Sequence, residues 1–407
     1  MKLKNSFFYT LREDVKDEDS ISSNLLVRSG MVKKISSGVY IFMPFGYRVL
    51  KKIEGIIREE MNNAGALELY MADMLPIDIF ERSGRIDAFG ESIFRLNDRY
   101  DKKYVLGPTH EEVFTLAATM GVKSYKDLPF TLYQFQTKFR DEPRPRYGLI
   151  RVREFIMKDA YSFDADLDGL EVSYRKMDRA YRNAFDRMKV KYKVVTADTG
   201  AMGGLLSEEF QAITDIGEDT LVLCDSCDYA SNIEVSECIT HNPNEEVTLL
   251  EKELIETVGA SAIEEVASLL NEAPDKFVKT LIYDVDGRIY ACLVKGNDEV
   301  NEVKLRKLLN ANEVVLASQD MVEHVTCASI GFAGPIGLNV SVIIDNAVLY
   351  MKNFIVGANK TDYHYKNVNL SDFNYDFAAD IRIIKEGDIC PKCNGKTYFK
   401  KGIEIGN

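Results

Sequence analysis

Apolar side chains recur at three- and four-residue steps in two stretches of the first half of the chain, and this spacing predicts two amphipathic helices. The first helix follows Pro44 and ends in the sequence Asn62-Asn63-Ala64-Gly65, which is typical of a helix C-cap. The second covers residues 170–188. Both apolar faces are expected to lie in the core, and residues 66–71 are expected to form a strand.

The pattern changes at Cys224, and from residue 246 onward the chain has the elements of a separate domain. Ser261 and Glu264 form a capping box, and Asp286-Gly287 between two apolar runs predicts a β-hairpin. The expected elements are a helix that ends at residue 270, strands over 277–283 and 288–294, a helix over 301–309, a glycine-rich loop over 331–337 and a strand over 340–344. We interpret this part as an inserted domain.

Length and composition restrict the class of protein. A chain of 407 residues with 46% hydrophobic and 28% charged residues is expected to fold into two or three globular domains. The net charge of −13 argues against a DNA-coating protein and limits nucleic-acid contacts to local basic patches. No signal peptide or membrane-spanning stretch is recognisable, and seven cysteines do not form a disulfide scaffold, so we expect a cytoplasmic protein.

One segment of this acidic chain, residues 138–158, is strongly basic. Its basic side chains are Lys138, Arg140, Arg144, Arg146, Arg151, Arg153 and Lys158. Arginine binds phosphate in a bidentate manner, and Pro143 and Pro145 place a loop between two β-like runs. A strand–loop–strand unit with Arg140 at the end of its first strand suits a nucleoside triphosphate. A solvent-exposed basic hairpin explains the spacing equally well.

Two further segments suit a small ligand. Thr109 and Glu111 point to the same side of an extended backbone, where a hydroxyl and a carboxylate can bind an ammonium group. Thr109 with Glu112 also matches a capping box, and the sequence alone favours that interpretation. Gly203-Gly204 allows either a close approach of the backbone to a ligand or a plain turn.

Two C-x-x-C pairs form a candidate metal site. Cys224, Cys227, Cys390 and Cys393 offer four thiolates for tetrahedral Zn²⁺. The pairs are far apart in sequence, but they fall at the two ends of the insertion, which must lie close together in space. Unrelated thiols are the alternative. The remaining cysteines are expected to be buried apolar residues: Cys238, Cys292 and Cys327.

The amino-acid sequence of the basic segment resembles that of a known protein family. Phe139-Arg140-Asp141-Glu142 followed by residues 151–155 looks like motif 2 of class II aminoacyl-tRNA synthetases, and residues 144–148 and 153–163 are similar to the bacterial-type prolyl branch. The resemblance implies an α+β fold in which an antiparallel sheet is flanked by helices and interrupted by a mixed α/β editing domain. The implied domains are a catalytic domain over 1–223, a neck over 224–240 and 388–400, an editing domain over 241–387, and a return to the catalytic domain over 401–407.

The resemblance implies a proline–tRNA ligase that uses ATP and Mg²⁺, proline and tRNA(Pro). Arg140 would contact the α-phosphate and the carboxylate of the reacting pair, and Glu142 the adenine. Arg151 would also bind ATP, while Arg144 and Arg146 would approach the acceptor end of tRNA. Such a reaction needs no side-chain nucleophile, because positive charge and positioning supply the catalysis.

The same resemblance assigns the proline pocket. Thr109 and Glu111 would bind the secondary ammonium group of proline. The segment G-G-x-x-S-x-E-F-Q would form a wall of the pocket, with Glu209 and Gln211 as its polar candidates.

The editing residues are recognisable only through the family. Without it, Lys279 is a surface lysine on a strand and His364 an ordinary polar histidine. The resemblance places both in a pocket that hydrolyses mischarged alanyl-tRNA(Pro), as catalytic residues. The residues carried over to this pocket are Lys279, Gly331, Gly334, Asp345 and His364. Alanine fits a small pocket that excludes proline, so the discrimination is by size.

The last residues, 401–407, have the pattern of a strand, and family members continue there into motif 3 and an anticodon-binding domain. We therefore expect a truncated product, a fragment or one part of a split enzyme, and a homodimer formed through motif 1. The alternatives to a full ligase are a chain that keeps only the editing deacylase activity and an inactive fragment.

Overall fold

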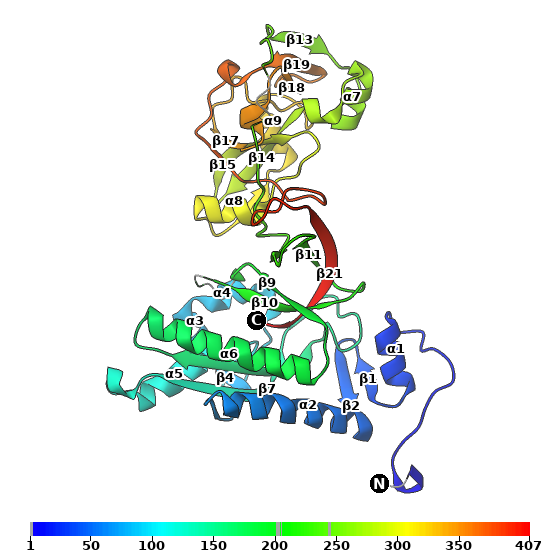
Figure 1. Ribbon diagram of the computed structural model, residues 1–407, viewed down its shortest axis with the longest axis vertical. Coiled ribbons are helices and arrows are strands. Elements are labelled where there is room, and N and C mark those ends of the chain that lie inside the picture. Colours follow the sequence, from blue (N-terminus) through cyan, green and yellow to red (C-terminus); the bar gives the residue numbers. More distant parts are fainter. Residues whose placement is uncertain (1–2, 201–203, 205, 243–245) are drawn as a thin grey trace. The chain divides into compact units, whose positions relative to one another are not determined.

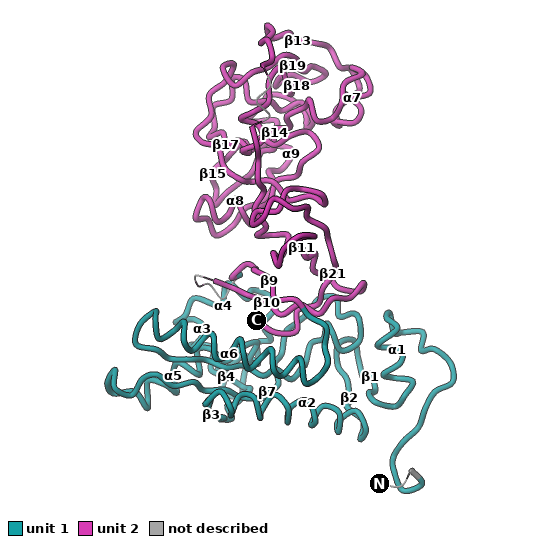
Figure 2. The backbone as a smooth tube through the Cα atoms, viewed as in Figure 1, with its two compact units in different colours: residues 1–192, 200–203 teal, residues 193–199, 204–407 magenta. Residues whose placement is uncertain are grey.

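A computed structural model describes residues 3–200, 204, 206–242 and 246–407. The chain forms two compact units, residues 1–192 with 200–203 and residues 193–199 with 204–407 (Figure 2). Several sheets, mainly antiparallel, alternate with helices, so the predicted α+β class is confirmed. No helix among the described residues combines the length and the apolar character needed to cross a membrane.

The first unit is built on a long hairpin (Figure 1). Strands β7 (Phe130–Phe139) and β8 (Glu154–Phe163) pair antiparallel over their full length, and β3 (Leu67–Glu68) pairs parallel with β7. Helices α2 (Pro44–Asn63) and α6 (Leu167–Arg187) pack on one face of this sheet. That core contains Met61, Ala66, Tyr133 and Ala180. The opposite face carries polar side chains, because residues alternate between the two faces of a strand.

Smaller elements complete the first unit. Its further helices are α1 (Ile21–Arg28), α3 (Ile77–Ser83), α4 (Arg85–Phe89) and α5 (Glu111–Gly121). Its further strands are β1 (Val32–Ser36), β2 (Val39–Phe42), β4 (Met74–Pro76), β5 (Arg95–Asn97) and β6 (Lys103–Leu106).

The two helices predicted in the first half are confirmed. Pro44 is the first residue of α2, where its missing N–H costs nothing. Helix α6 begins three residues earlier than the apolar spacing predicted, because Asp166 caps it by accepting a hydrogen bond from the Gly169 N–H. The strand predicted over 66–71 is shorter in the structure, where only the two residues of β3 are paired. The Met71 N–H instead donates a hydrogen bond to the side chain of Gln134.

The second unit begins with a closed barrel of order β10-β21-β11-β12-β9. Its strands are β9 (Tyr192–Thr196), β10 (Glu208–Ile213), β11 (Asp219–Cys224), β12 (Ala230–Asn232) and β21 (Thr397–Gly406). Strands β11 and β21 pair antiparallel from Asp219↔Gly402 to Cys224↔Thr397. Strand β12 follows β11 after a short turn and pairs antiparallel with it. The chain between β12 and β21, residues 233–396, therefore leaves the barrel beside β11 and re-enters it beside β11.

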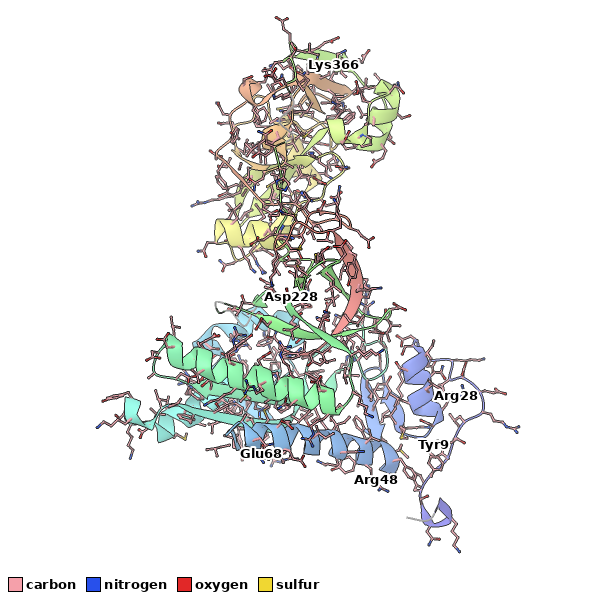
Figure 3. The ribbon with its side chains drawn as sticks, viewed as in Figure 1. Tyr9, Arg28, Arg48, Glu68, Asp228 and Lys366 are labelled. Carbon is pink, nitrogen blue, oxygen red and sulfur yellow. The ribbon has the colours of Figure 1, made fainter. Side chains whose placement is uncertain are left out.

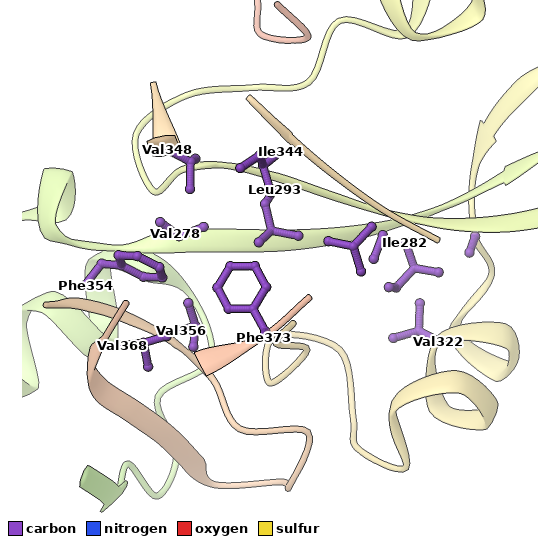
Figure 4. Close-up of a cluster of buried hydrophobic side chains, with 13 residues drawn as sticks. Val278, Ile282, Leu293, Val322, Ile344, Val348, Phe354, Val356, Val368 and Phe373 are labelled. Atoms are coloured by element: carbon purple, nitrogen blue, oxygen red, sulfur yellow. The ribbon is translucent and has the colours of Figure 1, made fainter. Parts of the chain in front are cut away.

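That intervening chain contains two packed sheets, of order β16-β14-β15-β17-β20 and β13-β19-β18. Their strands are β13 (Glu253–Glu256), β14 (Val278–Val285), β15 (Arg288–Lys295), β16 (Val314–Leu316), β17 (Ser341–Asp345), β18 (Phe354–Gly357), β19 (Tyr363–Val368) and β20 (Phe377–Ala379). The helices are α7 (Ile263–Leu270), α8 (Glu302–Leu309) and α9 (Gln319–Thr326). Figure 4 shows the main core, where Ile282 and Leu293 of the first sheet meet Phe354 and Val356 of the second.

Most elements predicted here are confirmed. Asp286 and Gly287 both have positive φ, as the tight turn between β14 and β15 requires. Asn301 caps α8. The predicted capping box is wrong, because Glu265 instead accepts hydrogen bonds from the backbone N–H groups of Ser261 and Ala262. The expectation for Cys327 is also wrong, because it is exposed in the left-handed position that ends α9.

Candidate active site

The predicted strand–loop–strand unit is present, with residues 140–153 as its loop. Arg140 follows β7 directly, and its backbone N–H donates to the Arg153 carbonyl at 3.0 Å. The exposed Arg140 guanidinium lies 5.3 Å from the centroid of the Phe155 ring, which rests on the same hairpin. The side chain is thereby presented at the end of the hairpin.

Acidic and basic side chains pair within this loop. Arg151 Nε lies 2.8 Å from Glu142 Oε2. Burial raises the pKa of Glu142, but the hydrogen bonds from Arg151 and from the Arg144 N–H outweigh it and leave the pKa lowered. Arg144 and Arg146 are exposed, and the Arg146 guanidinium lies 5.3 Å from the Tyr147 ring centroid. The loop thus offers two exposed arginines beside an ionised Glu142.

The segment that contains Thr109 lies beside Arg140, because the Phe139 N–H donates to the Gly107 carbonyl at 3.1 Å. Thr109 is 5% exposed, and its hydroxyl is 3.2 Å from that of Tyr161. Glu111 is the first residue of α5, so the extended backbone assumed for it is wrong. Its carboxylate lies 2.6 Å from Arg85 Nη1.

The capping box predicted from Thr109 and Glu112 is also wrong. His110 occupies the N-cap position of α5, and no side chain caps the helix there. Glu112 instead binds Arg85 at 3.1 Å and the Ser83 hydroxyl at 3.1 Å. Thr109 is consequently free of a capping role and faces Tyr161.

A buried polar cluster behind this segment was missed by the sequence analysis. Lys138 is 0% exposed, and its Nζ lies 2.6 Å from His110 Nδ1 and 3.0 Å from Asp159 Oδ1. Because Nδ1 accepts from the lysine, His110 Nε2 donates to the Ala72 carbonyl at 2.9 Å. Burial lowers the pKa of His110 and of Lys138. The available signal was the alternation of Gln134, Gln136 and Lys138 along one face of β7.

Glu209 and Gln211 lie on β10 of the barrel, in the other unit from Arg140. Gln211 is fully buried and donates 2.8 Å hydrogen bonds to Glu209 Oε2 and Asp219 Oδ2. Burial raises the pKa of Glu209 to about 6. Of the preceding glycines, Gly203 falls outside the described residues, and Gly204 has a φ of +111°, which glycine adopts without strain.

His364 forms the buried part of the second candidate site. Its Nδ1 lies 2.7 Å from the Thr257 hydroxyl, and its ring lies 5.5 Å from that of Phe332. Phe332 belongs to the glycine-rich loop, so the loop and His364 are neighbours. Neither Thr257 nor Phe332 had a signal in the sequence that linked it to His364.

The glycines of that loop are required by close backbone contacts. A Cβ atom on Gly334 would lie 1.7 Å from the Gly357 carbonyl oxygen, and one on Gly331 would lie 2.7 Å from the Ser261 Cβ. Asn359 fixes the loop, because its side chain accepts from the Gly334 N–H and donates to the Gly334 carbonyl. The loop with Gly331 and Gly334 thus contacts Gly357 at the end of β18, and it lies beside His364 through Phe332.

Lys279 and Asp345 lie on the other sheet. Lys279 forms a 2.6 Å ion pair with Glu299. The Asp345 carboxylate accepts backbone hydrogen bonds from Ala347, Ile381 and Arg382 at 2.9, 3.0 and 3.2 Å. Among the described residues, no hydrogen bond or ion pair joins either side chain to His364. Their assignment to one pocket stays a prediction, and Asp345 has a structural role in any case.

Acidification is expected to destabilise the part that contains His364. Burial lowers its pKa from 6.5 to about 4. Above pH 6.5 the imidazole is neutral in the folded and the unfolded chain. As the pH falls from 6.5 to about 4, only the unfolded chain gains the proton, so the free energy of unfolding falls by about 3 kcal/mol.

Urea unfolding at neutral and acidic pH checks this expectation. A His364→Gln variant should lose less stability on acidification than the parent chain. The matched control is His324→Gln on the exposed surface of α9, which should lose as much stability on acidification as the parent chain. Equal acid sensitivity of the parent and His364→Gln would show that His364 is not the group responsible.

All four cysteines of the C-x-x-C pairs meet in the second unit. Their sulfur atoms lie within 4.8 Å of one another. Cys224 and Cys390 are buried, Cys227 is partly buried and Cys393 is exposed.

Comparison with known proteins decides the family. Residues 257–373 match the aminoacyl-tRNA editing domain. A protein of Caldicellulosiruptor bescii named proline–tRNA ligase is 49% identical over the whole chain, which covers 71% of that protein. One of Thermoanaerobacter sp. strain X514 with the same name is also 49% identical, and the chain covers 72% of it. The chain belongs to the prolyl-tRNA synthetase family.

This membership confirms the family that the motif 2 sequence predicted, and with it the enzyme class, an aminoacyl-tRNA synthetase. The match over residues 257–373 confirms the editing domain. Among solved structures, the prolyl-tRNA synthetase of Cryptosporidium parvum with L-proline and AMP is similar at 17% identity and a TM-score of 0.42. That of Giardia lamblia with prolyl-adenylate is similar at 22% identity and a TM-score of 0.44. Each similarity covers 47% of this chain, and 39% and 41% of the other chain.

Proposed function

We propose that this prolyl-tRNA synthetase chain activates proline with MgATP, transfers it to tRNA(Pro), and hydrolyses mischarged alanyl-tRNA(Pro) in its editing domain. The observation that carries the synthetic part is the hydrogen bond from the Phe139 N–H to the Gly107 carbonyl, 3.1 Å long. It holds the segment of Thr109 and Glu111, proposed to bind the ammonium group of proline, beside Arg140, proposed to bind the α-phosphate.

The first step joins a carboxylate oxygen of proline to the α-phosphorus of ATP, and the bond to pyrophosphate breaks. Arg140 neutralises negative charge that grows on the α-phosphate in the transition state. Glu142 is proposed to contact the adenine, with Arg151 holding its carboxylate in place. Glu209 and Gln211 are proposed as polar groups of the proline pocket.

In the second step the terminal ribose hydroxyl of tRNA attacks the prolyl carbonyl, and AMP leaves. Arg144 and Arg146 support this step, because they are exposed on a loop and phosphate contacts need accessible cations. Zn²⁺, the other ion expected from the sequence, has no part in either reaction and would be structural.

A homodimer through motif 1, here the helix α2 with the strand β3 that follows it, is part of the proposal. Helix α2 exposes apolar side chains: Tyr47 is 48% and Val49 50% exposed. Tyr70, which follows β3, is 78% exposed. Apolar groups in adjoining elements of motif 1 support an interface with a second copy of the chain.

For editing, we propose that His364, Gly331 and Gly334 form the wall of a small pocket and that Lys279 and Asp345 complete it. With a pKa of about 4, His364 is a neutral imidazole at physiological pH. It can therefore bind or orient a substrate hydroxyl or water by hydrogen bonds, but it adds no positive charge.

Two assays on the purified chain test the proposal. Proline-dependent ATP–pyrophosphate exchange is expected, together with deacylation of alanyl-tRNA(Pro) but not of prolyl-tRNA(Pro). Deacylation without exchange would leave the editing function alone, an alternative favoured by the match of residues 257–373 to the editing family. A folded chain without either activity would overturn the proposal.

A further inference from the structure

The two C-x-x-C segments have the same local conformation. In each of the four cysteines, the sulfur accepts a hydrogen bond from the backbone N–H two residues later. The donors are Ser226, Tyr229, Lys392 and Gly395, at 3.3, 3.4, 3.4 and 3.4 Å. Such N–H···S contacts stabilise negatively charged sulfur, so they suit thiolates that bind a metal ion.

Distances between the sulfur atoms fit one metal ion. Cys224 Sγ lies 3.5 Å from Cys393 Sγ, and Cys227 Sγ lies 3.7 Å from Cys390 Sγ. A zinc ion with Zn–S bonds of about 2.3 Å in a tetrahedron requires S···S separations of about 3.8 Å. A disulfide would need about 2.05 Å. The separations therefore match ligands of one tetrahedral ion and exclude two disulfides.

The two segments are in close contact beside the sulfur atoms. A Cβ atom on Gly395 would lie 2.8 Å from Asp225 Oδ1 and from the Ser226 side chain. Asp225 further joins the segments, because its carboxylate accepts from the Lys396 N–H at 3.0 Å. Near the surface, Lys392 Nζ forms a 2.6 Å ion pair with Asp228, which Figure 3 labels. A site closed by four protein ligands is structural, since a catalytic zinc keeps an open position.

The location of the cluster indicates what the ion holds together. Cys224 is the last residue of β11 and pairs with Thr397, the first residue of β21. The Asp225 N–H continues this ladder to the Lys396 carbonyl at 3.0 Å. The four sulfur atoms thus lie at the end of the β11–β21 pair, between the turn from β11 to β12 and the segment that leads into β21.

We infer that Cys224, Cys227, Cys390 and Cys393 bind one Zn²⁺ ion, which clamps the turn between β11 and β12 to the segment before β21, at the base of the inserted residues 233–396. The inference extends the proposed function and does not depend on it, because metal binding is measured without either activity. Ion binding stabilises the folded neck relative to the unfolded chain, because the two segments are far apart in the unfolded chain.

Metal analysis of the purified chain tests the inference. One zinc per chain is expected for the parent and for Cys327→Ser, the matched control, whose thiol is exposed outside the cluster. Cys227→Ser and Cys393→Ser are expected to lose most of it. Because a variant can fail to fold, Co²⁺ is also exchanged into the parent. Four thiolates should then give the intense charge-transfer and ligand-field absorption of tetrahedral Co²⁺.

Removal of the ion by a chelator gives a second readout. Amide hydrogen exchange should increase at the paired ends of β11 and β21, while the β7–β8 hairpin in the first unit stays protected. A parent chain that holds no stoichiometric zinc after purification with added Zn²⁺, or that contains disulfides among these four cysteines, would overturn the inference. Stoichiometric zinc that stays bound in both Cys227→Ser and Cys393→Ser would also overturn the inference.

Discussion

Replacing Arg140 with alanine is expected to reduce proline-dependent ATP–pyrophosphate exchange by a factor of about 10²–10³, the usual cost of removing one group that stabilises transition-state charge. The exposed side chain follows β7, and its guanidinium lies 5.3 Å from the Phe155 ring centroid. Loss of that contact costs about 0.5–1 kcal/mol, so the fold should survive. The exchange rate and the thermal unfolding midpoint together check both statements.

The control for Arg140→Ala removes a comparable charge elsewhere in the same unit. Arg175 on α6 forms a 2.7 Å surface ion pair with Glu171 and lies on an exposed part of the helix. Arg175→Ala should keep the parental exchange rate, since a surface pair is worth little. Equal losses of exchange rate in the two variants would show that the effect comes from net charge. An unchanged exchange rate in Arg140→Ala would show that Arg140 does not bind the α-phosphate.

The elements that the sequence predicted well are those fixed by local chemistry. The helix after Pro44, the turn at Asp286-Gly287 and the cap at Asn301 each depend on a few neighbouring residues. The errors arose where a more distant group competes. Thr109 matches a capping box, but its hydroxyl faces that of Tyr161 on β8, and Arg85 pairs with Glu112.

For the candidate site, the sequence could predict only the residues that belong to recognisable motifs. The wording around Arg140 placed it at the end of a strand, and the structure agrees. Motifs do not specify which sheet carries each residue, however. Lys279 and His364 fall on different sheets, and the sequence had no means of showing this. The sequence analysis named Lys138 only as one basic residue of the segment 138–158. Its burial depends on His110 and Asp159, which are distant in sequence.

Replacing Lys138 with methionine is expected to lower the free energy of unfolding by about 3–5 kcal/mol, because it breaks a buried ion pair from one side. Lys138 is 0% and Asp159 8% exposed, so water cannot replace the lost partner. The variant leaves Asp159 Oδ1 without its cation and His110 Nδ1 without its donor. Urea unfolding against the parent measures the loss, and Lys176→Met, on the exposed side of α6, should change stability by less than about 0.5 kcal/mol.

A double variant separates the two causes of that loss. Lys138→Met combined with Asp159→Leu removes both charges, so much of the stability should return, because an apolar pair of similar volume is often as stable as a buried ion pair. His110 would still lack its donor, and it lies between Thr109 and Glu111. The KM for proline should therefore be raised in Lys138→Met and also in the double variant, even where stability recovers. A double variant no more stable than Lys138→Met would show that the loss comes from packing and not from an unpaired carboxylate. Recovery of both stability and KM would show that His110 does not need Lys138 to position the proline segment.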